Sequence, residues 1–147
     1  MLLIVITHTE SFPGEAEVLN QLFDAGLTHC HLRKPYGDAA ATRRLLNGIK
    51  PGYYDRMALH QHHQLADEYG IKRLHFNEQH RATTDPSTMP GYTLSTSVHS
   101  LSTASQLSAV FSYAFFSPVF NSISKPGHHA VIGEGFYWPP EKKMVPM

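Results

Sequence analysis

The 147-residue sequence has a single cysteine, no net charge and no long hydrophobic run. One thiol, Cys30, excludes an intramolecular disulfide framework and suits a reducing compartment. Twelve basic side chains balance twelve acidic ones, so any anion must be bound by a local site rather than by an overall field. The apolar start, Met1 to Ile6, has no cationic leader and is too short to span a bilayer. We therefore expect a cytoplasmic protein with neither a nucleic-acid nor a membrane partner.

The amino-acid composition is that of a globular domain. Apolar residues make up 41% of the chain and charged residues 16%, unlike a disordered segment or a coiled coil. The length is that of one domain with a hydrophobic core. Eleven histidines are the unusual count, and they make the net charge sensitive to pH near about 6.5.

Short β-type runs alternate with helical patterns along the chain. The predicted strands are 2–7, 27–32, 56–60, 72–76, 92–97 and 113–116, and the predicted helices are 15–25, 38–47, one that ends at Tyr69, and 101–109. Residues 81–90, rich in Thr, Ser and Pro, are expected to hold only a short helical turn. This alternation predicts a parallel sheet, either a doubly wound open sheet or a (β/α) barrel.

Polar residues follow the carboxyl ends of five successive predicted strands, which is typical of a barrel rim and not of a single switch point. They are Arg33, the His60–His63 segment, His75 to Asn77, Ser97 to His99, and Ser117 to Lys125. We predict an incomplete TIM-type (β/α) barrel of about six βα units over residues 1–127, because a complete barrel needs eight units and about 200 residues. Residues 128–147 are predicted to form an irregular C-terminal tail.

Four motifs at these strand ends together resemble the thiamin phosphate synthase and thiazole tautomerase (TenI-like) family. They are His31-Leu32-Arg33-Lys34, Leu74-His75-Phe76-Asn77, Ser95 to Ser100, and Phe116 to Pro126. The resemblance implies a (β/α)₈ barrel whose mouth binds thiazole phosphate. Synthases of the family join this substrate to a pyrimidine pyrophosphate with magnesium, whereas tautomerases aromatise the thiazole ring.

The resemblance also implies roles for individual residues. Arg33 matches the arginine of the family's Gln-Leu-Arg-x-Lys motif, and a guanidinium can clamp a phosphate. His99 lies where tautomerases have an acid/base histidine, and an imidazole accepts and donates protons near neutral pH. We assign His99 as the catalytic residue and a further set as substrate- or phosphate-binding: Arg33, Ser97, Ser122, Ser124 and Lys125. Two alternatives remain open: Arg33 in a rim salt bridge, and His99 as the residue that precedes a helix capped by Ser100.

The magnesium positions of a synthase are changed in this sequence. Synthases place an Asn-Asp pair after the third strand and an aspartate after the fourth, where this chain has His60-Gln61 and His80. Magnesium prefers carboxylate and water oxygens, so we expect no cofactor, and magnesium only if the synthase alternative holds. The remaining rim candidates are His31, which replaces the family's glutamine, His60, Gln61, His75, Asn77 and His80.

The histidines also raise the question of a different metal. Imidazoles suit zinc, nickel or copper. The spacing of His60, His62 and His63 is not His-x-x-x-His, however, and no cysteine joins them. We therefore expect no metal site.

The family's glycine-rich phosphate loops after the seventh and eighth strands have no counterpart here, since Gly133 and Gly135 follow no convincing strand. Either the chain is truncated or frameshifted, or a second copy supplies the missing wall, and the open barrel edge predicts a homodimer. The leading interpretation is a thiazole tautomerase-like enzyme acting on thiazole phosphate. The alternatives are a thiamin phosphate synthase and an inactive ligand-binding fragment.

Overall fold

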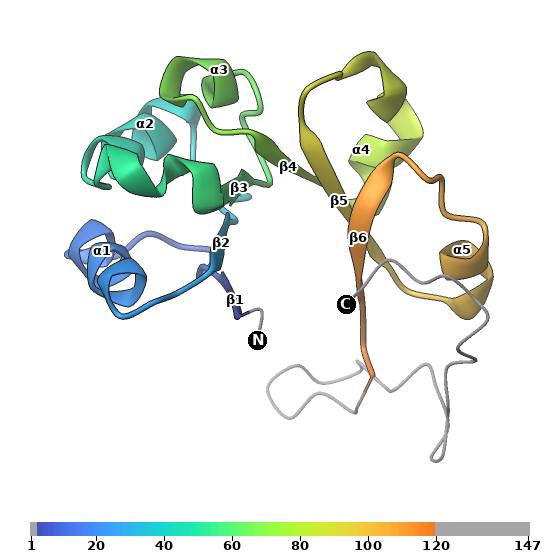
Figure 1. The fold of residues 1–147 in the computed structure, drawn as a ribbon, viewed down its shortest axis with the longest axis horizontal. Helices are drawn as coiled ribbons and strands as arrows, with labels where there is room; N and C mark the ends of the chain where they lie inside the picture. The colour runs from blue at the N-terminus through green and yellow to red at the C-terminus, as the bar shows by residue number, and fades with distance from the viewer. Residues whose placement is uncertain (1–2, 120–147) are drawn as a thin grey trace. The chain divides into compact units, whose positions relative to one another are not determined.

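The structure is a computed structural model and describes residues 3–119. Its strands form one parallel sheet in the order β1-β2-β3-β4-β5-β6 (Figure 1). The strands are β1 (Ile4–Ile6), β2 (His29–Leu32), β3 (Met57–Leu59), β4 (Arg73–Phe76), β5 (Thr93–Val98) and β6 (Phe111–Phe116). An order that follows the chain without reversal is that of a (β/α) barrel, whereas a doubly wound sheet reverses at its switch point. The predicted fold class, six βα units of the TIM type, is confirmed.

Helices connect each strand to the next. They are α1 (Glu15–Asp24), α2 (Ala39–Asn47), α3 (Leu65–Tyr69), α4 (Glu78–Thr83) and α5 (Leu101–Ser105), with 3₁₀ helices at Pro51–Arg56 and Pro86–Thr88. Two differ from the sequence prediction. Helix α4 begins before the predicted turn, because the Asn77 side chain accepts a hydrogen bond from the His80 N–H at 2.8 Å. Helix α5 ends at Ser105 instead of residue 109, in a serine-rich stretch whose hydroxyls compete for backbone groups: Ser105 Oγ donates to the Ser102 carbonyl.

Internal contacts divide the chain into two compact units. The first comprises the residues up to His75 together with Pro90–Thr93. Its core is formed by buried apolar side chains from α1–α3, β2–β4 and the segments that connect them: Leu19, Phe23, Leu32, Leu46, Ile49, Met57, Leu59, Leu65, Ile71 and Leu74. Asp38 caps α2, as predicted, by accepting from the Ala41 N–H at 2.6 Å, and Gly70 ends α3 at a φ of 68°. Cys30 is a core side chain, and burial raises its pKa to about 12.

The second unit comprises Phe76–Met89 and the described residues from Leu94 onward. Val98, Ala114 and Phe116 form its buried cluster, with partly buried Ala104, Leu107 and Val119 packed against them. Strands β5 and β6 pair in parallel, and the register shifts between Leu94 and Ser95. Ser100 caps α5 by accepting from the Thr103 N–H at 3.0 Å.

In residues 3–119, no helix has the length and apolar character needed to cross a membrane.

Candidate functional site

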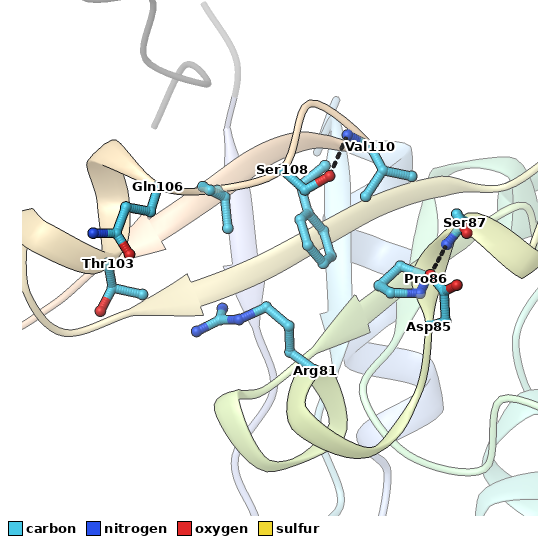
Figure 2. A pocket seen from close by; sticks show the side chains of 10 residues that line it. Arg81, Asp85, Pro86, Ser87, Thr103, Gln106, Ser108 and Val110 are labelled. Carbon is cyan, nitrogen blue, oxygen red and sulfur yellow. Dashed lines mark hydrogen bonds between the residues drawn. The ribbon is translucent and has the colours of Figure 1, made fainter.

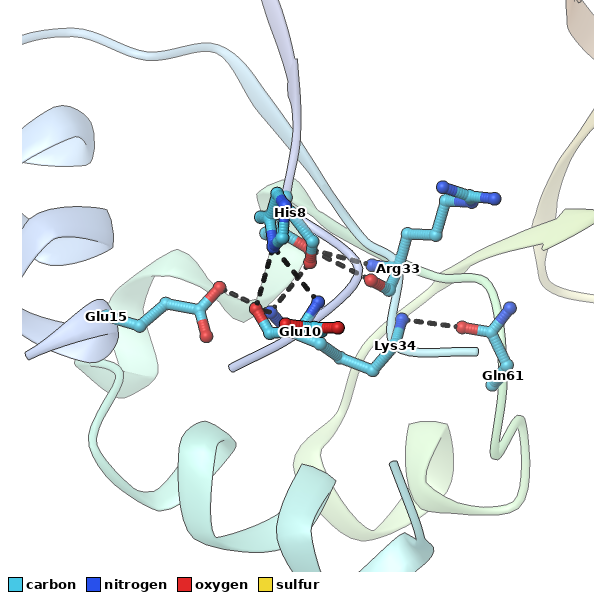
Figure 3. Close-up of polar contacts among 7 residues, drawn as sticks. His8, Glu10, Glu15, Arg33, Lys34 and Gln61 are labelled. Carbon is cyan, nitrogen blue, oxygen red and sulfur yellow. Dashed lines mark hydrogen bonds and ion pairs between the residues drawn. The ribbon is translucent and has the colours of Figure 1, made fainter. Parts of the chain in front are cut away.

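The loop after β2 is held by a buried lysine. Lys34 Nζ lies 2.6 Å from Glu15 Oε1 and also donates to the carbonyls of His8 at 2.8 Å and Glu10 at 3.1 Å (Figure 3). Both charged side chains are almost completely buried. Lys34 is therefore a structural residue.

Arg33, its neighbour, has a different environment. Its backbone is fixed by Thr7, whose hydroxyl accepts from the Arg33 N–H at 3.0 Å and donates to the Arg33 carbonyl at 3.3 Å. Its half-buried side chain extends away from Glu15 and Glu10 (Figure 3). Within residues 3–119 the guanidinium forms neither a hydrogen bond nor an ion pair. The rim salt bridge considered as an alternative is thus not found among these residues, and the cation can bind an anion.

Gln61 follows β3 and is already engaged by the protein. Its Oε1 accepts a hydrogen bond from the Lys34 N–H at 2.7 Å (Figure 3). His60, the residue before it, packs against the imidazoles of His31 and His75. An amide oxygen that is used by the backbone, next to an imidazole, does not fit the oxygen-rich shell that magnesium requires.

Three imidazoles come together at the ends of β2, β3 and β4. His31 Nδ1 lies 2.9 Å from His60 Nε2, and the His60 and His75 rings stack with centroids 3.9 Å apart. All three side chains are buried. Burial, and then the nearby His29 and Arg73, lowers the pKa of His31 to about 4. Burial, and then the neighbouring imidazoles, holds the pKa of His60 well below its usual range. The rings of His31 and His60 are therefore neutral at pH 7.

In the second unit, His99 follows β5 and is exposed. Its Nδ1 lies 2.7 Å from the Ser117 carbonyl oxygen, just beyond β6. Because a carbonyl only accepts hydrogen bonds, Nδ1 carries the proton and Nε2 is the nitrogen that can take up a proton. The Ser117 N–H in turn donates to the Val98 carbonyl at 3.2 Å, which ties this loop to the end of β5.

Arg81 of α4 is a residue that the sequence analysis missed. Its Nη1 donates to Thr96 Oγ1 at 2.5 Å and to the Ser97 carbonyl at 2.9 Å. The Arg81 side chain of α4 thereby fixes the backbone of the half-buried Ser97. The position of Arg81, one helical turn after Asn77, is the signal that could have found it.

Two of the rim candidates build the start of α4. Asn77 is its N-cap, and the backbone N–H of His80 is the donor that Asn77 satisfies. The positions of Asn77 and His80 are therefore explained by local structure.

A pocket of about 370 Å³ lies within the second unit (Figure 2). Its lining combines Arg81 with polar and apolar side chains from the 85–87 and 103–111 segments. None of the predicted site residues within 3–119 lines it, so the pocket is separate from that part of the predicted substrate-binding set.

The structure places Arg33, His31, His60, Gln61 and His75 in the first unit, and Asn77, His80, Ser97 and His99 in the second. Ser122, Ser124 and Lys125, like the predicted tail 128–147, lie outside the described residues. Their assignments stay predictions.

A parallel βα sheet whose strand order follows the chain is the architecture of a (β/α) barrel. Residues 3–146 match the thiamine monophosphate synthase family (TMP-TENI), and the chain belongs to this family. It is similar to the crystal structure of thiamine phosphate pyrophosphorylase from Bacteroides thetaiotaomicron, with a TM-score of 0.72 and 33% sequence identity. That similarity covers 81% of this chain and 59% of the other, so this chain spans less than two thirds of its solved relative. A comparison with curated proteins gave no match.

Proposed function

We propose that this chain is a thiamin-biosynthesis enzyme that binds thiazole phosphate and moves a proton on the thiazole ring, a reaction of the tautomerase type. The observation that carries this proposal is the 2.7 Å contact between His99 Nδ1 and the Ser117 carbonyl. It orients the imidazole and directs proton exchange to Nε2. Such orientation of one ring nitrogen by a backbone carbonyl is a common way to prepare a histidine for acid/base chemistry.

The other residues of the proposal bind the substrate. Arg33 supplies a guanidinium that no described acid neutralises, which suits a phosphate or carboxylate. Ser97 offers a hydroxyl two residues before His99, and Arg81 fixes its backbone. The proton transfer needs only these groups and no cofactor.

Thiamin phosphate synthase is the second candidate, and the solved relative favours it, because that protein is a thiamine phosphate pyrophosphorylase. This reaction requires magnesium in the family that the sequence resembles. The described residues at the corresponding positions, His60, Gln61 and His80, supply no carboxylate. We therefore place the synthase reaction second.

The discriminating experiment is a pair of assays on purified protein. With the thiazole carboxylate phosphate tautomer, the wild type is expected to produce the aromatic thiazole without added metal. His99→Asn keeps a side chain that can donate to the Ser117 carbonyl but cannot transfer the proton, so we expect a loss of about 100-fold or more. His8→Asn, a change at an exposed histidine of the first unit, is the matched control and keeps full activity.

The opposite results are equally informative. Magnesium-dependent formation of thiamin phosphate from thiazole phosphate and the pyrimidine pyrophosphate, without tautomerisation, would establish the second candidate. Binding of thiazole phosphate in calorimetry with no turnover would leave the inactive ligand-binding fragment. The proposed homodimer is checked by sizing chromatography of the same sample, and a strictly monomeric species contradicts it.

A further inference from the structure

Three histidines from three neighbouring strands lie on one face of the sheet in the first unit. Residues Leu32 and Leu59 are partners in the β2–β3 register, as are Leu59 and Leu74 in the β3–β4 register. His60 and His75 each follow their paired leucine by one residue, so they are level with each other and point to the same side. His31 precedes Leu32 by one residue, which places its side chain on that same side, one pleat earlier.

Buried histidines in this number are unusual in an apolar core. Each imidazole carries two polar ring nitrogens, and burying them costs free energy that an aliphatic side chain of similar size avoids. The three side chains are nevertheless 0%, 6% and 1% exposed, for His31, His60 and His75 respectively. The arrangement gathers ring nitrogens from three strands at one place, and imidazole nitrogens are common ligands of transition metals.

We propose that His31, His60 and His75 together bind one divalent cation of the zinc class. One nitrogen from each ring lies within 4.8 Å of the other two. This site is independent of the proposed tautomerase reaction, because neither His99 nor Arg33 belongs to it. It also differs from the magnesium site of a synthase in ligand chemistry: nitrogen donors select zinc, cobalt, nickel or copper, whereas magnesium takes oxygen.

The distances are those of a site that closes around an ion by small ring rotations. With Zn–N bonds of about 2.0–2.1 Å in a tetrahedral shell, two ligand nitrogens lie about 3.3 Å apart. The 2.9 Å separation of His31 Nδ1 and His60 Nε2 is slightly shorter than this, and the 4.8 Å limit is longer. The His31 ring stands at 82° to His60 and 75° to His75, so nitrogens approach from more than one direction.

His62 and His63, although adjacent in sequence, are occupied elsewhere. His62 Nε2 donates to the Gly37 carbonyl at 2.8 Å, and His63 Nε2 donates to the His75 carbonyl at 3.2 Å. The second contact fixes the backbone of a proposed ligand, as outer residues of metal sites commonly do. The sequence-based expectation of no metal site rested on the spacing of histidines along one helix. The proposed ligands instead come from three neighbouring strands, so that spacing does not bear on this site.

The cluster has a further chemical consequence. Its three members are imidazoles and, within residues 3–119, no carboxylate belongs to the cluster. Sites with three protein ligands leave a coordination position for water or a bound group, in contrast to four-ligand structural sites.

The test uses the full chain without an affinity tag, stripped with a chelator and titrated with CoCl₂ and ZnCl₂ at pH 7.5. We expect one equivalent of Co²⁺ to give intense visible bands of a four- or five-coordinate ion, and Zn²⁺ to abolish them. X-ray absorption of the zinc form should count three imidazoles. Saturating Zn²⁺ should raise the melting temperature by about 5 °C or more. None of these readouts depends on turnover.

Variants locate the ion. His31→Gln and His75→Gln should each weaken Co²⁺ binding by about 100-fold or more, while His8→Asn leaves it unchanged. Absence of binding by the wild type, or binding that His31→Gln and His75→Gln leave intact, overturns the proposal. If a variant fails to fold, the imidazole count on the wild type decides, and fewer than three imidazoles overturns it.

Discussion

Lys34 and Glu15 form an ion pair of 2.6 Å in the first unit, with side chains only 4% and 3% exposed. Lys34 also donates to two backbone carbonyls, so its ammonium has three acceptors in the protein interior. The pair joins the start of α1 to the loop that follows β2. That loop contains Arg33, so the pair fixes the place from which the proposed anion-binding guanidinium projects.

Breaking this pair on one side should be costly. Lys34→Met leaves the Glu15 carboxylate buried without its partner, and we expect a loss of about 3–5 kcal/mol in the free energy of unfolding. Adding Glu15→Leu to Lys34→Met should recover most of that loss, because the double variant buries no charge. Urea unfolding of the two single variants and the double variant measures the coupling.

The matched control is an exposed pair of similar geometry. Arg43 and Glu68 are 2.8 Å apart, with side chains 43% and 45% exposed. Arg43→Met should change the free energy of unfolding by about 0–1 kcal/mol. An equally large loss at both pairs would contradict the assignment of Lys34 as a buried structural residue.

The histidine cluster predicts acid sensitivity of the metal-free protein. Burial lowers the pKa of His31 from 6.5 in the unfolded chain to about 4 in the fold. Between these values the unfolded chain binds one more proton, so stability is complete above about pH 6.5 and is lost as the pH falls toward 4. The His31 contribution amounts to about 3 kcal/mol.

The measurement is the urea midpoint as a function of pH with a chelator present. The His31→Gln variant lacks this titrating group. The slope of its free energy of unfolding against pH should therefore be smaller than that of the wild type, by about 1.4 kcal/mol per pH unit. His8→Asn, at an exposed histidine, should keep the wild-type slope. A slope that His31→Gln leaves unchanged would show that His31 is not the buried titrating group.

Hydrophobic periodicity predicted the order of the strands, and the polar residues at their carboxyl ends favoured the barrel over a doubly wound sheet. Buried parallel strands appear as short aliphatic runs, and glycines such as Gly70 mark helix ends. The strand bounds differ by one or two residues, as expected where strands fray. The start of α4 was missed because the Thr- and Pro-rich segment after it obscured the Asn77 capping signal.

The site was less accessible to sequence reasoning. Arg33 and His99 were singled out from the sequence because polar residues that follow parallel strands are typical of a functional rim, and their roles stay predictions. The burial of Lys34 was not predictable, since its partner Glu15 lies on a different element and no spacing rule joins the two. The His31–His60–His75 cluster was missed for the same reason: strand register, not position along one helix, brings these rings together.

The proposed anion role of Arg33 makes a specific prediction about geometry. Arg33→Lys keeps the charge but loses the planar fork, so affinity for thiazole phosphate in calorimetry should fall by about 10-fold, and Arg33→Ala should weaken it further. The free energy of unfolding should change by about 0.5 kcal/mol or less, because the guanidinium has no partner within residues 3–119. Arg43→Lys is the control. Equal affinity for Arg33→Lys and wild type would argue against a bidentate contact.

Asn77 provides a test between a capping and a ligand-binding role. Its side chain accepts from the His80 N–H at 2.8 Å, so Asn77→Ala should cost about 1 kcal/mol in the free energy of unfolding. Asn77→Asp and Asn77→Ser retain a side-chain oxygen for the cap and should stay within about 0.5 kcal/mol of the wild type. If Asn77 acts only as a cap, these two variants also keep wild-type affinity for thiazole phosphate. A drop in affinity at unchanged stability would instead place the Asn77 amide against the ligand, because a serine or aspartate can satisfy the helix but cannot reproduce an amide donor.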